Sequence, residues 1–424
     1  MTSVYLPEHA VLSPAQRRCR LLLTLCLPDC LVTLESVCQL NGVDLPLVRQ
    51  DIAELATEIQ RNHHLAIEQD GQGRLSLNGT ALNQRLCLMH GLRRALRVSL
   101  QFVSGWFADA VKRRLQAQFI DKALYSEHNL TRLIRHCSQR LAREFSPRDS
   151  HFLHIWLQFS LAWPCQPQFS PLQQQWLQHK AEYALAQEII RCWQRRGWPA
   201  DDNQAALLAL LFSQLHAPLI EEIACESERS LLQAVELLIQ RFQQIAGIEF
   251  HHKAGLSVRL YTHLAQALER TLFAIAIAIN DNLAENVALQ YPRLLRTTRE
   301  AIVAVEQQYA VTFSQEEMEL MAIIFGAWLV QEHAPHEKQV LLLTEKNPKL
   351  ERQIEQQLRE LTLLPLNIKY LDVNDFQRDS APPGITLVIS PYATSLPLYS
   401  PPLIHAELPL GEHQQQSIRT LLES

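Results

Sequence analysis

The sequence predicts a mainly α-helical protein that begins with a winged helix-turn-helix, continues through two helical bundles and ends in a small α/β domain. Apolar residues recur at intervals of three and four over most of the 424 residues, which is the spacing of amphipathic helices. A glycine-rich turn at residues 70–73 joins two short apolar runs, as in a β-hairpin. After Pro335 the periodicity changes, and residues 340–343 form the continuous apolar run of a buried parallel strand. The predicted domains span residues 1–96, 97–220, 221–336 and 337–424.

The composition restricts how this chain can meet other molecules. Its hydrophobic residues, 47% of the total, suffice for a sizeable core in each domain. The formal net charge of −5 excludes the overall basic excess that drives non-specific nucleic-acid binding, so any DNA contact must come from a local patch. The longest apolar run, residues 272–279, is far shorter than the roughly 20 residues of a membrane span, and residues 1–8 lack a signal-peptide pattern. We therefore expect a cytoplasmic protein without membrane contact.

The nine cysteines do not form the pattern of a disulfide framework, because their number is odd and no Cys-x-x-Cys pair occurs. A zinc site could be drawn from Cys26, Cys30 and Cys38 together with His63 and His64. No second close pair follows at the spacing of a zinc ribbon, however, so buried thiols are the favoured interpretation. We expect neither a metal nor a cofactor.

Residues 1–96 carry the signals of a helix-turn-helix followed by a hairpin. Ser13 and Pro14 fit the N-cap and first position of one helix. A second helix should follow Thr33 and stop near Gly42, and Asp44 then caps a third. The third helix is expected at about residues 45–60, and the hairpin strands at residues 65–67 and 74–77.

The third predicted helix is where a helix-turn-helix protein reads DNA. In its first turns, Arg49 and Gln50 have side chains able to contact base edges, and Arg74 on the predicted wing is a candidate phosphate contact. The acidic cap Asp44 and the apolar residues 46–47 are poor partners for phosphates and bases. This segment therefore predicts a winged-helix fold more strongly than it predicts DNA binding.

Residues 97–220 are predicted to form several helices separated by prolines. His154 lies in this stretch among apolar neighbours, and Leu161 stands seven residues later. Without a cationic side chain at that distance, His154 is the weaker candidate for a functional histidine. A structural role is the favoured interpretation.

The most distinctive residues lie in the second helical bundle, where His263 and Arg270 belong to one amphipathic helix. Seven residues are roughly two turns, about 10.5 Å along the axis, so both groups should lie on one face. An imidazole near a guanidinium is suited to accept a phosphoryl group or to sense phosphate. The alternative is a hydrogen-bonded histidine within a helical bundle.

These residues resemble a family, the phosphotransferase-system regulation domain or PRD. The resemblance covers about residues 230–332 and rests on His263-Leu-x-x-Ala-Leu-x-Arg270, Asn282-Leu283, Tyr291-Pro292 and Ser314-x-x-Glu317-Met318. It implies a helical domain that is phosphorylated on histidine, here His263, with Arg270, Arg293 and Arg296 able to pair with the phosphate. Ile324 stands where the family usually has a second histidine, so this switch would rest on His263 alone.

The flanking segments resemble the modules that accompany such domains. Residues up to about 94 resemble the winged helix of antiterminator-like and mannitol-type transcriptional activators, and residues 97–220 resemble a first, degenerate regulation domain. The last segment resembles an enzyme IIB-like domain, whose cysteine takes phosphate. Here the loop at residues 344–348 has no cysteine, and none follows Cys225, so we expect no enzyme activity. Solvated loop positions account for Glu345, Lys346 and His405.

The order of the modules implies a transcriptional regulator that responds to phosphorylation or docking by a phosphocarrier or enzyme II component of the phosphotransferase system. We expect a homodimer that binds DNA. The alternative is a protein-interaction module that has lost DNA reading and binds a phosphotransferase component or another regulator. A phosphotransfer enzyme is disfavoured, because the cysteine that such an enzyme requires is absent.

Overall fold

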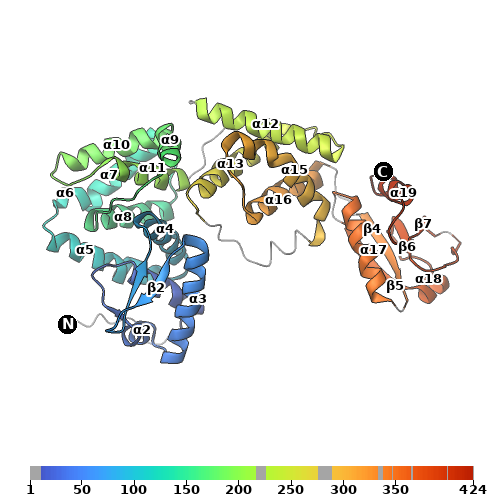
Figure 1. The fold of residues 1–424 in the computed structure, drawn as a ribbon, viewed down its shortest axis with the longest axis horizontal. Helices are drawn as coiled ribbons and strands as arrows, with labels where there is room; N and C mark the ends of the chain where they lie inside the picture. The colour runs from blue at the N-terminus through green and yellow to red at the C-terminus, as the bar shows by residue number, and fades with distance from the viewer. Residues whose placement is uncertain are drawn as a thin grey trace. The chain divides into compact units, whose positions relative to one another are not determined.

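The computed structural model describes residues 11–215, 226–275, 289–332, 338–345, 347–363, 366–398 and 400–423 (Figure 1). The chain divides into two compact units, one made of residues 1–217 and 272–276, the other of residues 218–271 and 277–424. The predicted boundaries at residues 220 and 336, and Asn282-Leu283, lie outside the described residues. At the predicted boundary after residue 96, helix α4 (Ala81–Val98) continues without a break.

The first unit begins with the predicted three helices and hairpin. A two-residue strand adds to the hairpin, so the sheet is antiparallel and three-stranded in the order β1-β3-β2. Ser13 and Asp44 cap their helices as predicted, and Gly42 ends the second helix with a φ of 64°, a left-handed conformation that glycine adopts without strain. The elements are α1 (Pro14–Leu25), β1 (Val32–Thr33), α2 (Leu34–Asn41), α3 (Leu45–His63), β2 (Ala66–Gln69) and β3 (Arg74–Asn78).

A helical region follows α4 in the same unit. Its core is rich in aromatic side chains, among them Phe107, Trp156 and Phe212, and it also takes in Phe273 from the second segment of the unit. Phe273 packs edge-on against Phe169, with ring centroids 6.2 Å apart. The elements are the π-helical segment η1 (Phe102–Phe107), α5 (Ala108–Ala117), α6 (Lys122–Tyr125), α7 (Glu127–Arg140), α8 (Pro147–Ala162), α9 (Pro171–Gln178), α10 (Ala181–Gln194) and α11 (Asp202–Leu215).

The second unit contains a helical bundle, as predicted for residues 221–336. Its described helices are α12 (Glu226–Ala246), α13 (Lys253–Leu272), α15 (Pro292–Tyr309) and α16 (Gln315–Glu332) (Figure 1). Phe242 and Phe325 stack in its interior, with ring centroids 3.9 Å apart. At Gly255 a Cβ atom would lie 2.4 Å from the Trp328 ring, so this glycine lets α13 and α16 approach closely.

The chain closes with a four-stranded parallel sheet in the order β5-β4-β6-β7. The predicted apolar run is the centre of β4, and its side chains alternate between two cores. Val340 and Leu342 pack against α17 and α19, whereas Leu341 and Leu343 pack against α18. The elements are β4 (Lys338–Thr344), α17 (Pro348–Leu361), β5 (Leu366–Asp372), α18 (Val373–Asp379), β6 (Leu387–Ser390), β7 (Leu403–His405) and α19 (Glu412–Glu423).

Among the helices of the described ranges, none combines the length and the hydropathy that a bilayer span requires.

Candidate functional site

Helix α13 places His263 and Arg270 together. Leu260, Leu264 and Leu268 form the buried stripe of this helix, and the spacing of seven leaves the two polar groups on a neighbouring face. Their side chains are 13% and 15% exposed. The predicted common face is confirmed, because both side chains contact the same carboxylate.

That carboxylate belongs to Glu317, in the first turn of α16, and its side chain is 2% exposed. Arg270 donates to it through two nitrogens, Nε to Oε1 at 2.5 Å and Nη2 to Oε2 at 3.0 Å. This bidentate geometry is the strongest form of an arginine–carboxylate contact. The three residues, His263, Arg270 and Glu317, are called the α13–α16 cluster below.

His263 is held less completely than Arg270. Its Nε2 atom lies 3.1 Å from Oε2 of Glu317, within ion-pair distance. The atom is nevertheless buried, and among the described residues it makes no hydrogen bond of acceptable direction. Oε2 accepts from Arg270, and Nε2 of His263 lies near the same oxygen in a direction that does not suit a hydrogen bond.

The charge state of Glu317 follows from its neighbours. Burial raises the pKa of this carboxyl group, but the nearby imidazole of His263 and the hydrogen bonds and positive charge of Arg270 outweigh burial, so its pKa lies below the ordinary value of 4.5. Glu317 is therefore an anion at neutral pH. A second anion arriving at His263 would meet a negative charge and compete for the same guanidinium.

The other two predicted phosphate partners contact the C-terminal domain. Arg293, at the start of α15, donates to the backbone carbonyls of Leu361 and Ala246. Arg296 forms an exposed ion pair with Glu360 of α17, at 3.1 Å. Neither contact places these arginines in the α13–α16 cluster.

His154 lies in α8 and makes hydrogen bonds to neutral groups. Its Nδ1 is 2.9 Å from the carbonyl oxygen of Ser150, and its Nε2 is 3.2 Å from the Thr131 hydroxyl and 3.5 Å from the carbonyl oxygen of Glu127. These contacts join α8 to α7. Leu161, seven residues later, is fully buried.

The predicted DNA contacts lie on the N-terminal helices and hairpin. Arg49 and Gln50 are exposed in the first turns of α3, where Gln50 donates to Glu54 at 2.9 Å. Arg74 is exposed at the start of β3. Asp44 caps the helix through the Leu47 amide, so its carboxylate lies at the same end as Arg49.

In the C-terminal domain, the loop after β4 is occupied by an internal carboxylate. Oε1 of Glu351 accepts from the Glu345 amide at 3.0 Å and from the Tyr392 hydroxyl at 2.9 Å. His405 lies 3.8 Å from Glu407, and Lys346 is outside the described residues. Within the described ranges, no group of three histidine, cysteine or acidic side chains is placed to hold a metal ion.

Glu317 is the member of the α13–α16 cluster that sequence reasoning missed. Ser314-x-x-Glu317 predicts a capping box, and half of it exists, because the Glu317 amide donates to the Ser314 hydroxyl at 3.3 Å. The Glu317 side chain turns instead to α13. The sequence did offer one signal for this contact, because the acidic Glu317 belongs to the same family motif as His263.

Comparison with known proteins places these features in a family. A family model described as the PRD domain matches residues 236–328, which contain the whole α13–α16 cluster. A second model, described as the C-terminal domain of stationary phase-inducible protein CsiE, matches residues 338–422. The stationary phase-inducible protein CsiE of Escherichia coli (strain K12) is 46% identical over 423 residues, covering 99% of each chain. The chain therefore belongs to the CsiE family.

Proposed function

We propose that this protein is a cytoplasmic regulator whose state is set by the phosphotransferase system through His263. The observation that carries the proposal is the α13–α16 cluster, a partly buried imidazole and arginine that share one buried carboxylate inside the PRD segment. Such a cluster has two arrangements of charge, one with the carboxylate alone and one with an added phosphate. A regulatory domain needs two states of this kind.

In the proposed reaction, a ring nitrogen of His263 attacks the phosphorus of a phosphohistidine on the phosphocarrier. One N–P bond forms as another breaks, so no further reactant is consumed. A phosphoryl group on Nε2 would occupy the position of the Glu317 carboxylate, 3.1 Å away. It adds about −1.5 to −2 charge units, so repulsion would expel Glu317 and Arg270 would pair with the phosphate.

The displacement of Glu317 links the site to the packing of the bundle. Glu317 is in the first turn of α16, and its amide is held by the Ser314 cap. Moving its side chain breaks the bidentate contact between α13 and α16. Phosphate at His263 would thereby favour a different packing of these two helices, which a homodimer interface can transmit.

The output we propose is DNA binding by the N-terminal domain. The order helix, strand, two helices and hairpin, with an antiparallel sheet β1-β3-β2, supports the proposal of a winged helix. Arg49 and Gln50 on α3 would face bases, and Arg74 would contact a phosphate. The C-terminal domain would have no transfer activity, because Glu351 fills the loop where an incoming phosphate would need the backbone amide.

The alternative function, an interaction module without DNA reading, is favoured by one observation. The N-terminal end of α3 presents the carboxylate of Asp44 beside the exposed Leu45, and a DNA phosphate would meet a negative charge there. Salt dependence separates the two functions. A DNA reader loses affinity steeply between 50 and 200 mM salt, and Arg49→Ala weakens it, whereas Arg191→Ala, an exposed arginine of α10, leaves it unchanged.

Phosphotransfer is tested by incubating the full chain with radiolabelled phosphoenolpyruvate, enzyme I and the phosphocarrier, and mapping the acid-labile phosphate. We expect label on the wild type and on His154→Ala, and none on His263→Ala. Label that survives in His263→Ala, or a wild type that takes none, would overturn the proposal.

A further inference from the structure

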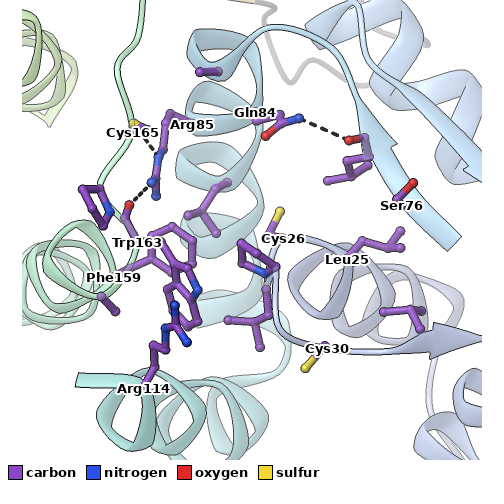
Figure 2. A pocket seen from close by; sticks show the side chains of 18 of the residues that line it. Leu25, Cys26, Cys30, Ser76, Gln84, Arg85, Arg114, Phe159, Trp163 and Cys165 are labelled. Atoms are coloured by element: carbon purple, nitrogen blue, oxygen red, sulfur yellow. Dashed lines mark hydrogen bonds between the residues drawn. The ribbon is translucent and has the colours of Figure 1, made fainter. Parts of the chain in front are cut away.

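A cavity of about 550 Å³ lies in the first unit, between the N-terminal helices and sheet and the helical region that follows (Figure 2). One wall comes from residues 25–32, β3 and α4, and the other from α5, α8 and residues 163–165. Ligand-binding pockets have volumes of roughly 300–1,000 Å³, so this cavity is large enough for a small organic molecule. The proposed function makes no use of it.

Arg85 of α4 lines this cavity and is 8% exposed. Its Nε donates to Sγ of Cys165 at 3.0 Å, its Nη2 donates to the Trp163 carbonyl, and its guanidinium lies 4.6 Å from the centroid of the Phe159 ring (Figure 2). The remaining nitrogen, Nη1, is buried and has no hydrogen-bond partner among the described residues. Within the described part of the chain, no carboxylate pairs with this cation.

A buried guanidinium without a paired carboxylate is costly, because no opposite charge offsets its lost hydration. An unpaired buried polar group in a native protein calls for an explanation, and a bound ion or ligand is one. A carboxylate entering the cavity beside Arg85 would supply the negative charge that no described side chain provides for this cation. Arg85 is thus the polar anchor of the cavity.

The rest of the lining determines which anion fits. None of the described lining residues is acidic, although Asp29 lies against two of them, accepting from the Trp163 indole N–H at 3.1 Å and pairing with Arg114. Arg114 also lines it, but this arginine is already paired with Asp29 at 3.2 Å. Burial raises the pKa of the Cys26 thiol to about 12, so this thiol is neutral. One uncompensated positive charge therefore remains, that of Arg85.

The other surfaces of the cavity combine apolar side chains with polar ones such as Ser76, Gln84 and Gln118. Leu25, Leu88, Phe159 and Trp163 contribute aliphatic and aromatic side chains on both walls. A highly charged ligand, such as a phosphate monoester, would leave its second charge unbalanced against these surfaces. A monocarboxylate with an apolar body matches both the single charge and the apolar walls.

We propose that this cavity is a binding site for a small amphipathic monocarboxylate, with Arg85 holding the carboxylate and the apolar walls holding the tail. Such a ligand would contact β3 and α4 on one side and α8 on the other. It would therefore restrain the hairpin relative to the first helical region. The inference does not depend on phosphorylation at His263.

The first test compares head groups on the unmodified full-length protein. Equilibrium dialysis is carried out with octanoate, 3-phenylpropionate, 1-octanol and octylammonium at constant ionic strength. We expect saturable binding of at least one carboxylate with a stoichiometry near one, at least about tenfold tighter than 1-octanol, since a charge-assisted contact is roughly worth that factor or more. Equal binding of octanoate and 1-octanol, or no binding of either carboxylate, would overturn the proposal.

The second test changes the anchor. Arg85→Gln should weaken the bound carboxylate by about 10- to 100-fold, and Arg191→Gln, a matched exposed arginine outside the cavity, should leave it unchanged. Arg114→Gln changes a partly exposed position and should weaken carboxylate binding only a few-fold. The substitution leaves the Asp29 charge unpaired near the cavity. Unaltered affinity in a folded Arg85→Gln protein would contradict the proposed anchor. If Arg85→Gln fails to fold, the head-group comparison still decides.

Discussion

Two histidines, one in each helical region, have opposite surroundings. His154 in α8 is bonded to a hydroxyl and two backbone carbonyls. His263 in α13 faces a buried carboxylate that is shared with an arginine, and its Nε2 lacks an aligned hydrogen bond. In the first environment both ring nitrogens have hydrogen-bond partners, and these contacts join α7 to α8. The second holds a charge balance that one added anion would upset.

The comparison shows that a histidine becomes a candidate switch through the charges around it. A ring bonded to neutral groups gains nothing when its neighbours move, whereas the proposed phosphate would give the α13–α16 cluster a second arrangement. Removing charge at the second site should therefore cost far more than removing a hydrogen bond at the first.

The largest effect should come from Glu317→Ala. It leaves Arg270 and His263 partly buried without their common anion, and breaking such a buried pair costs about 3–5 kcal/mol. We expect faster amide exchange in α13 and α16, measured by hydrogen exchange and mass spectrometry. Glu300→Ala, an exposed carboxylate on α15, serves as the control and should change little. Equal exchange in both variants would remove the cluster from the stability of the bundle.

A third histidine, His63 at the end of α3, extends the comparison, because it is buried and no acidic side chain among the described residues forms an ion pair with it. Burial, together with Arg94 and His64, lowers its pKa from 6.5 to about 4. Below pH 6.5 the unfolded chain binds a proton that the folded ring refuses, so the free energy of unfolding should fall between pH 6.5 and about 4. The loss amounts to roughly 3 kcal/mol when converted at 1.36 kcal/mol per pKa unit.

Urea unfolding at pH 7, 5.5 and 4.5 measures this pH dependence. Tryptophan fluorescence is a suitable signal, because six of the seven tryptophans precede residue 217 and belong to the first unit. The control variant His63→Phe should lose most of the decrease between pH 6.5 and 4. A decrease that persists unchanged in His63→Phe would assign it to other groups.

A smaller effect is expected at the first histidine. Thr131→Val removes the hydroxyl that lies 3.2 Å from Nε2 of His154 and keeps the shape of the side chain. The hydroxyl also donates to the Glu127 carbonyl at 2.8 Å, so the variant loses two hydrogen bonds between neutral groups. Because Thr131 is exposed, their loss should lower the free energy of unfolding of the first unit by only about 1–2 kcal/mol. The same urea experiments measure it at pH 7. A loss as large as that of Glu317→Ala would erase the distinction between the two sites.

The smallest effect should come from Arg296→Ala. Its ion pair with Glu360 joins two side chains that are 53% and 40% exposed, and such pairs contribute about 0–1 kcal/mol. Phosphate incorporation at His263 should also be unchanged, because this arginine contacts α17. A marked fall in phosphate incorporation in Arg296→Ala would indicate that Arg296 is a phosphate partner.

The residues show which parts of the fold and site could be predicted from sequence. A spacing of seven correctly placed His263 and Arg270 on one face, and the apolar run at residues 340–343 correctly predicted the central strand β4. Both are local patterns with a fixed period. Glu317 could not be assigned in this way, because it lies 47 positions from Arg270 and its motif also describes a helix cap.

The sequence also did not reveal which distant residues contact each arginine in the folded chain. Arg293 and Arg296 were candidates because a guanidinium in the same domain can pair with a phosphate, yet they contact Leu361 and Glu360 of the C-terminal domain. The same limit applies to Arg85. Its burial beside the cavity depends on residues 159–165, which lie some 80 positions later in the chain.

The central claim is that phosphate on His263 displaces Glu317 from Arg270. Hydrogen exchange of α13 and α16 tests it most directly, in protein phosphorylated by the phosphocarrier and in the same protein after acid removes the label and the chain is refolded. The account predicts faster exchange at the end of α13 and the start of α16 only while phosphate is present, and no change in His263→Ala. Identical exchange with His263 fully phosphorylated would contradict it.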